Sequence, residues 1–194
     1  LRSVLRVRNG EFNSVSTLNF LKVEEDVKYK EVTYGSLTLS VPRDIRDNHH
    51  DVCLHMATVV YPSTDGFLDA GDVVYCHHFL THKDNERLIF GDTVYSMRTD
   101  EIYLKIIDSE IHMLPDWILV EQAFDEIPQS ASGLYLQSEP DEKTNMGYIR
   151  HVHPDKDIKP GSMVSFRKNS EYTLMVNDKL YYRMKYEDLE SILT

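Results

Sequence analysis

Leu68-Asp-Ala-Gly71-Asp-Val-Val-Tyr75 returns in altered form as Ile158-Lys-Pro-Gly161-Ser-Met-Val-Ser-Phe166. In both stretches a glycine precedes an alternating apolar run, the pattern of a β-strand that follows a turn. Each stretch also follows a bulky residue and a proline, Tyr61-Pro62 in one case and His153-Pro154 in the other. The period of about 90 residues, from position 68 to position 158, is too long for a solenoid, whose repeats run to roughly 20–50 residues. It predicts two copies of one small domain.

The two copies also end alike. Tyr95-Ser-Met-Arg-Thr-Asp-Glu-Ile102 corresponds to Tyr182-Arg-Met-Lys-Tyr-Glu-Asp-Leu189. Each segment carries a pair of acids after a strand-like run, and acids are favourable near a helix N-terminus. We therefore predict short helical turns over residues 100–106 and 187–193.

Short strand-like runs separated by turn residues fill most of the remaining sequence, which predicts an all-β fold of the sandwich or barrel type. Asn9-Gly10, Phe90-Gly91-Asp92 and Val176-Asn177-Asp178 are expected to form hairpin turns. The predicted strands are 20–24, 37–41, 52–60, 72–79, 87–90 and 93–97, then 117–121, 134–136, 147–152, 162–167, 172–176 and 179–184. The expected organisation is an N-terminal β-hairpin (1–17), a first domain (18–107), a short linker (108–116) and a second domain (117–194).

The composition excludes several partners. The net charge of −11 and the lack of a basic stripe argue against nucleic acid, because nucleic-acid affinity depends on clustered Lys and Arg. Solubility is the simpler explanation of the acidity, and a surface for a basic partner is the alternative. No apolar run is long enough to span a membrane. Cys53 and Cys76 both fall in the first copy, which suits reduced thiols in the cytoplasm, although strand neighbours could pair under oxidation.

The sequence contains none of the common catalytic motifs. It lacks a nucleophile elbow, a phosphate loop and a dinucleotide fingerprint, so we predict no enzyme and no cofactor. The acid pairs that could serve as general acid and base are explained more simply by capping. No metal site is predicted, because the histidines occur outside any Cys-x-x-Cys or His-Glu-x-x-His motif. Cys53, Cys76 and His78 could approach one another across strands, but they do not form such a motif.

Six elements follow one another through the second copy. They are an apolar strand (117–121), Gly133-Leu-Tyr-Leu136, a strand ending at a proline (147–154), Lys159-Pro-Gly-Ser-Met-Val164, the turn Asn177-Asp178, and Glu187-Asp-Leu-Glu-Ser-Ile192. This order and spacing resembles a subunit of the GroES-like co-chaperonin family. The first copy is similar in Gly35-Ser-Leu-Thr-Leu39, Ala70-Gly-Asp-Val-Val74 and Asp100-Glu-Ile102. Two features depart from the family pattern: residues 154–160 are too few for its roof hairpin, and Tyr135 and Thr38 replace aliphatic patch centres.

The resemblance implies two tandem GroES-like β-barrels, with short terminal helical turns and an N-terminal β-hairpin. It further implies a cytoplasmic homo-oligomer that binds a GroEL-like chaperonin ring through flexible apolar loops and assists protein folding. The loop residues would be Gly133, Leu134, Tyr135 and Leu136 in the second copy, and Gly35, Leu37 and Leu39 in the first.

Two alternatives stay open. The apolar patches could be ordinary core strands, which we favour for Leu37 and Leu39 and consider equally good for 134–136. The whole chain could instead be a structural or assembly protein, for example from a virus, that uses GroES-like barrels as oligomerisation or interaction modules.

Overall fold

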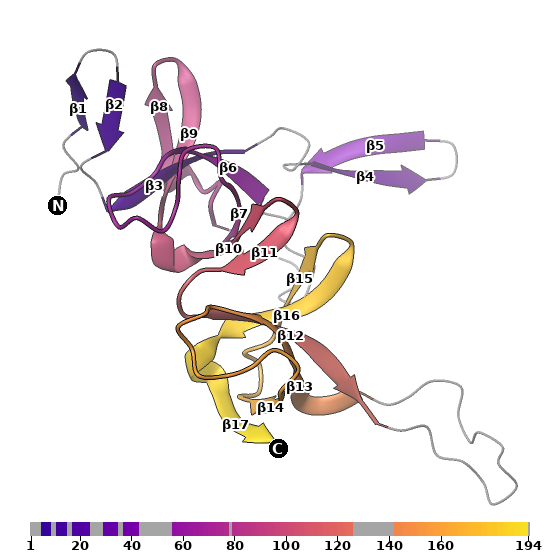
Figure 1. Ribbon diagram of the computed structural model, residues 1–194. Helices are drawn as coiled ribbons and strands as arrows, with labels where there is room; N and C mark the ends of the chain where they lie inside the picture. The colour runs from indigo at the N-terminus through magenta and orange to yellow at the C-terminus, as the bar shows by residue number, and fades with distance from the viewer. Residues whose placement is uncertain are drawn as a thin grey trace, which may run out of the picture. The chain divides into compact units, whose positions relative to one another are not determined.

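The computed structural model describes residues 5–8, 11–14, 17–23, 29–34, 37–42, 56–77, 79–125 and 142–193 (Figure 1). Throughout these residues the regular structure is antiparallel β-strand, interrupted by single 3₁₀ turns, so the protein is all-β as predicted. The chain forms two compact units, Leu1–Pro115 (unit 1) and Asp116–Thr194 (unit 2). No helix among the described residues has the length and apolar character needed to cross a membrane.

The described residues of unit 1 form one seven-stranded sheet and two hairpins. The sheet has the order β11-β10-β7-β6-β3-β9-β8. Its strands are β3 (Leu18–Lys22), β6 (Met56–Tyr61), β7 (Val73–Cys76), β8 (Glu86–Ile89), β9 (Asp92–Arg98), β10 (Ile102–Ile107) and β11 (Glu110–Met113). The hairpins pair β1 (Leu5–Arg8) with β2 (Glu11–Ser14), and β4 (Tyr29–Tyr34) with β5 (Leu37–Pro42). Strand β11 lies within the segment that the sequence marks as a linker.

Unit 2 contains one six-stranded sheet, in the order β15-β16-β12-β13-β14-β17. Its strands are β12 (Trp117–Phe124), β13 (Glu142–Val152), β14 (Met163–Phe166), β15 (Tyr172–Val176), β16 (Lys179–Lys185) and β17 (Leu189–Leu193). The sheet strands of the two units can be matched in chain order: β3, β6, β7, β8, β9 and β10 with β12, β13, β14, β15, β16 and β17. With this matching the two sheets have the same strand order, except that the unit 1 sheet has the additional strand β11 beside β10. Both sheets are open, since no described pair joins their end strands into a closed barrel.

Strands β10 and β17 correct the helical prediction. At these two places the described chain forms only the single 3₁₀ turns Thr99–Glu101 and Tyr186–Asp188, and the residues after them are strands. A single turn leaves most of its backbone groups unpaired and is too short to propagate a helix. The apolar residues that follow are therefore better stabilised in a ladder, where β10 buries Ile102 and Leu104 completely.

The hairpin turns agree with the prediction. Arg8 pairs with Glu11 on either side of the Asn9-Gly10 dipeptide. Phe90 and Gly91 join β8 to β9 with φ values of 52° and 92°, and Asn177 and Asp178 join β15 to β16 with φ values of 50° and 60°. Positive φ at both central residues defines the tight turn whose twist matches that of antiparallel strands.

Each unit has its own apolar core. The main unit 1 cluster gathers side chains from β3, β6, β7, β9 and β10 and from segments next to the strands: Leu21, Val23, Ala57, Val59, Leu68, Val74, Cys76, Leu80, Tyr95, Met97, Ile102 and Leu114. The unit 2 cluster consists of Ile118, Val120, Ile149, Ile158, Val164, Phe166 and Met184.

Gly147 on β13 provides a test of the unit 2 packing. A Cβ at this position would lie 2.3 Å from Val120 Cγ1 and 2.6 Å from the Glu121 carbonyl oxygen, and backbone cannot yield as a side-chain tip can. We predict that Gly147→Ala lowers the free energy of unfolding by roughly 1–3 kcal/mol, the usual cost of overpacking. Urea denaturation measures this change. Thr144→Ala, at an exposed site on the same strand, is the control; equal midpoints for the two variants would contradict the tight approach.

Candidate functional site

The two predicted apolar patches occupy the same topological position. Residues 133–136 belong to the connection between β12 and β13, and residues 35–39 belong to the connection between β3 and β6. In both sheets these are adjacent antiparallel strands. Each candidate segment is therefore an excursion from the hairpin formed by the first two strands of its sheet.

The structure describes only part of these patches. Gly133, Leu134, Tyr135, Leu136 and Gly35 lie outside the described residues. Among the described residues, the structure therefore shows no contact between two of the predicted site residues.

Within the first patch, residues 37–41 form a strand as predicted. This strand, β5, forms a hairpin with β4, in which Leu37 pairs with Tyr34 and Leu39 pairs with Val32. The sequence did not predict β4, because the charged pair Lys30-Glu31 interrupts its apolar pattern. The side chain of Leu37 is 56% exposed, so the prediction that it lies in a core is wrong. The predicted burial of the Leu39 side chain lies outside the described residues.

The second connection leaves and re-enters the sheet at one place. Phe124 pairs with Glu142, and the Asp125 carboxylate lies 3.7 Å from Lys143 Nζ, so the ends of segment 126–141 are adjacent. Between the pairs Gln122–Gly147 and Phe124–Glu142, β13 contains more residues than β12 and is bulged. Bulges bend a strand and increase its twist, and they are common beside functional segments. Phe124 is 48% exposed at this base.

A charged cluster joins three strands of the unit 2 sheet, β12, β13 and β16. The Glu121 carboxylate on β12 accepts hydrogen bonds from Arg150 Nε on β13 at 2.6 Å and from Lys179 Nζ on β16 at 2.9 Å. The Lys179 hydrogen bond, followed by that of Arg150, holds the pKa of Glu121 below its usual value of 4.5. The cluster therefore cross-links the strands through an ionised carboxylate. Sequence reasoning missed it because strand pairing alone brings positions 121, 150 and 179 together.

His151 lies beside this cluster and is uncharged at neutral pH. Burial lowers its pKa below 6.5, and the nearby Lys179 and Arg150 charges lower it further. Its ring packs against Tyr181 in an edge-to-face arrangement, with centroids 5.6 Å apart. The described surroundings of His151 are thus an aromatic ring and two cations, and the cations disfavour protonation of the imidazole.

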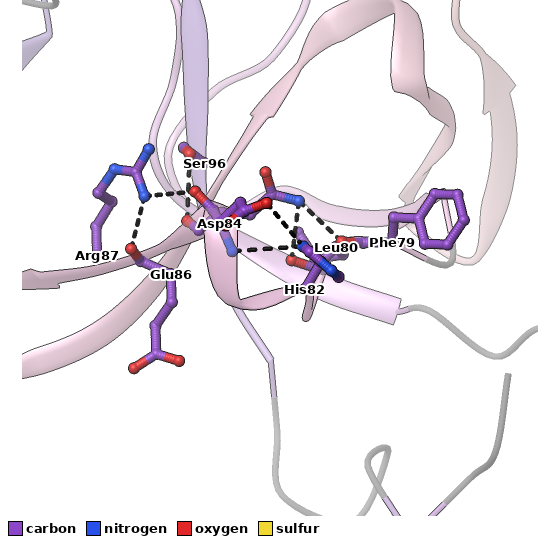
Figure 2. Close-up of polar contacts among 8 residues, drawn as sticks. Phe79, Leu80, His82, Asp84, Glu86, Arg87 and Ser96 are labelled. Atoms are coloured by element: carbon purple, nitrogen blue, oxygen red, sulfur yellow. Dashed lines mark hydrogen bonds and ion pairs between the residues drawn. The ribbon is translucent and has the colours of Figure 1, made fainter.

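The loop between β7 and β8 of unit 1, residues 77–85, is longer than its unit 2 counterpart, residues 167–171. Figure 2 shows its polar contacts. The Asn85 side-chain amide donates to the carbonyl oxygen of Phe79 at 2.8 Å, and Arg87 donates to those of Asp84 and Glu86 at 2.7 Å. The Phe79 ring points away from these contacts. Backbone carbonyls take up the donors, so the loop stabilises its own shape.

His77, His82 and His153 make local contacts with residues close in sequence. The ring nitrogens of His82 and His153 accept backbone N–H groups two residues on, and His77 stacks on Phe79 with centroids 4.9 Å apart. Cys76 is buried in the unit 1 core, whereas Cys53 and His78 lie outside the described residues. Where the structure is described, no three His, Cys, Asp or Glu side chains gather as metal ligands would.

The lowered pKa of Glu121 gives a test of the charged cluster. A depressed folded-state pKa adds stability above the usual value of 4.5, and this stability is lost as pH falls through the folded-state pKa. Glu121→Gln should therefore lower Tm by at most a few degrees at pH 7, and the difference should shrink as the pH falls below 4.5. Thermal melts at pH 7 and over a series of pH values below 4.5 measure the effect. Asp157→Asn, at an exposed carboxylate, is the control; a pH-independent difference would contradict the assignment.

Comparison with known proteins adds one finding. The family model described as "Chaperonin 10 Kd subunit" matches residues 110–193, the stretch from β11 to β17. No curated protein sequence matches the chain significantly. Residues 110–193, including the segment that connects β12 to β13, are thus similar to the chaperonin 10 kDa subunit, the GroES-like family.

Proposed function

We propose that the chain is a co-chaperonin-like protein that binds a GroEL-like chaperonin ring and assists protein folding. The observation that carries this proposal is the family match over residues 110–193, which spans every strand of unit 2. Unit 1 has the same strand order, and on this proposal it is a divergent copy of the same module.

The binding groups in this proposal are the apolar patches on the connections: Gly133, Leu134, Tyr135 and Leu136 in unit 2, and Gly35, Leu37 and Leu39 in unit 1. The exposure of Leu37 supports a role for this residue in docking, because a docking side chain must be accessible before the partner binds. An apolar patch that enters a groove gains the free energy of burial, and several patches held in one assembly gain avidity. The protein would therefore act by binding, without chemistry of its own.

The base of the unit 2 connection supports the same role. Phe124 and Glu142 hold the two ends of this connection side by side, and the Glu121 cluster ties their strands to β16. A segment that docks on a partner is thereby anchored at both ends to a well-paired sheet. On this proposal the protein is a cytoplasmic homo-oligomer.

The unit 2 patch is tested by the double variant Leu134→Asp, Leu136→Asp. If both leucines are buried in a chaperonin groove, affinity for a GroEL-type ring with ATP should fall by about 100-fold or more. Each buried leucine contributes about 1.5–3 kcal/mol, and 1.4 kcal/mol is a factor of ten. Calorimetric titration measures the affinity, and negative-stain imaging reports capped particles.

Gln137→Asp in the same segment is the matched control, and circular dichroism with thermal melting reports the fold. Loss of binding with an unchanged Tm supports the proposal. Broad loss of stability would mark the leucines as core residues. No binding by the unchanged protein, with a defined oligomer of the free chain, would favour the assembly protein.

The unit 1 patch is tested separately by Leu37→Asp. Because this side chain is already exposed, the variant should keep its Tm within the narrow range of ordinary surface substitutions. Affinity for the ring should fall by about tenfold or more, the equivalent of one lost leucine contact. Leu88→Asp, at a more exposed leucine on β8, is the control. Unchanged affinity for the Leu37 variant would restrict binding to unit 2.

A further inference from the structure

The central strands of the two sheets occupy equivalent places. β3 lies between β6 and β9, and β12 lies between β13 and β16. Their registers also agree, because Leu21 pairs with Tyr95 on β9 and Val120 pairs with Tyr182 on β16. Chains that contain similar domains are prone to misassembly by exchange of equivalent elements. The side chains that differ between β3 and β12 therefore decide whether each strand enters its own sheet.

Asn19 on β3 is the first of these differences. Its side chain is completely buried. Its amide nitrogen donates a hydrogen bond to Thr99 Oγ1 at 2.9 Å, and its amide oxygen accepts one from the Ser63 backbone N–H at 2.8 Å. Thr99 in turn donates to the Asp65 carboxylate. Both ends of the Asn19 amide are thus bound by groups that belong to unit 1.

In unit 2 the same position is apolar. Ile118 is equivalent to Asn19, because each pairs with the methionine at the same place on the neighbouring strand. Ile118 is completely buried in the unit 2 cluster. Tyr186 begins the 3₁₀ turn η4 as Thr99 begins η3, and it also packs against this cluster. An apolar side chain therefore stands where unit 1 has its hydrogen-bonded amide.

The second difference is a reversed ion pair. In unit 1 the Lys22 ammonium on β3 lies 3.9 Å from the Asp92 carboxylate on β9. In unit 2 the Glu121 carboxylate on β12 binds Lys179 on β16 and Arg150 on β13. Lys22 and Glu121 each lie one residue beyond the last pair that their strand makes with β9 or β16. Asp92 and Lys179 are the first residues of those two strands. The charges are thus exchanged between equivalent positions.

Exchange of β3 and β12 would turn both differences into penalties. Asn19 would be buried in the apolar cluster of unit 2, and Ile118 would leave the Ser63 N–H without its acceptor; buried polar groups without partners are costly. Lys22 would lie beside two cations and Glu121 beside a carboxylate, and like charges on facing strands are destabilising. Since exposed charges contribute little, the buried position carries most of the discrimination.

We propose that Asn19 and Lys22 assign β3 to the unit 1 sheet, and that Ile118 and Glu121 assign β12 to the unit 2 sheet, so that the chain folds without exchanging its central strands. The same residues oppose exchange between two chains, which would produce a domain-swapped assembly. Such specificity requires that the wrong pairing be unfavourable as well as the right one favourable. The inference concerns folding and does not depend on binding to a chaperonin ring.

The test lets one cysteine choose between two partners. Leu18 pairs with Arg98 on β9, and after exchange it would take the place of Trp117 and face Lys185 on β16. A chain with Leu18→Cys, Arg98→Cys, Lys185→Cys and Cys53→Ser can therefore form a native or an exchanged disulfide, since facing residues of antiparallel strands lie within reach. The chain is unfolded in urea with reductant, refolded and oxidised. Mass spectrometry of its peptides gives the ratio of exchanged to native disulfide.

With no further change, the native disulfide should predominate. The fourfold variant Asn19→Ile, Lys22→Glu, Ile118→Asn, Glu121→Lys gives each central strand the residues of the other. The ratio should then shift toward the exchanged disulfide by about 100-fold or more, because the buried polar penalties now fall on the native arrangement. Lys22→Glu with Glu121→Lys alone should shift the ratio in the same direction by about twofold to tenfold.

Leu21→Val with Val120→Leu is the matched control, because it exchanges two completely buried apolar residues of the same strands and should leave the ratio unchanged. Three results would overturn the proposal: an equal shift in this control, no shift in the fourfold variant, or predominance of the exchanged disulfide without any exchange of residues. Circular dichroism reports whether each variant folds. If the fourfold variant does not, the charge variant decides, because its side chains are 51% and 33% exposed, and the absence of a shift there overturns the proposal.

Discussion

The central strand β12 is the element on which the rest of unit 2 depends. Both of its edges are paired, with β13 and with β16, and Trp117 to Val120 are buried in succession. Because four consecutive residues are buried, the strand has no face toward solvent here, and water cannot pair with its backbone N–H and C=O groups. These groups must therefore form their hydrogen bonds with the two neighbouring strands. Once β12 is fixed, Glu121 is placed between Arg150 and Lys179, and Phe124 is placed where the candidate segment begins.

The two units keep their ladders while their connections differ. The link from the first to the second strand holds the β4–β5 hairpin in unit 1, and the link from the third to the fourth strand is longer there than in unit 2. Strand register is constrained, because a slip of one residue would move every side chain to the opposite face. Connections at the surface carry no such penalty. Functional divergence between the units is therefore expected in the connections.

The positions of most strands and of the three hairpin turns follow from local sequence, since Asn-Gly, Phe-Gly and Asn-Asp sit between alternating runs. What the sequence could not predict depends on distant partners. The acidic pairs just before β10 and β17 are typical of the start of a helix. These segments form strands because they pair with β7 and β14, which are distant in sequence. β11 is short and follows a turn, so its four residues look like a linker until β10 is beside them. For the candidate site, the positions of the two patches in the chain were predictable, whereas the exposure of Leu37 and the Glu121 cluster required the structure.

Because β11 pairs with β10 in the unit 1 sheet, the region that matches the family model and the compact unit 2 begin at different residues. The family match begins at Glu110, whereas unit 2 begins at Asp116. Division before Glu110, where the family match begins, would therefore remove β11 from the unit 1 sheet. Division after Pro115 would leave both described sheets whole, because every strand of the unit 2 sheet lies beyond this point.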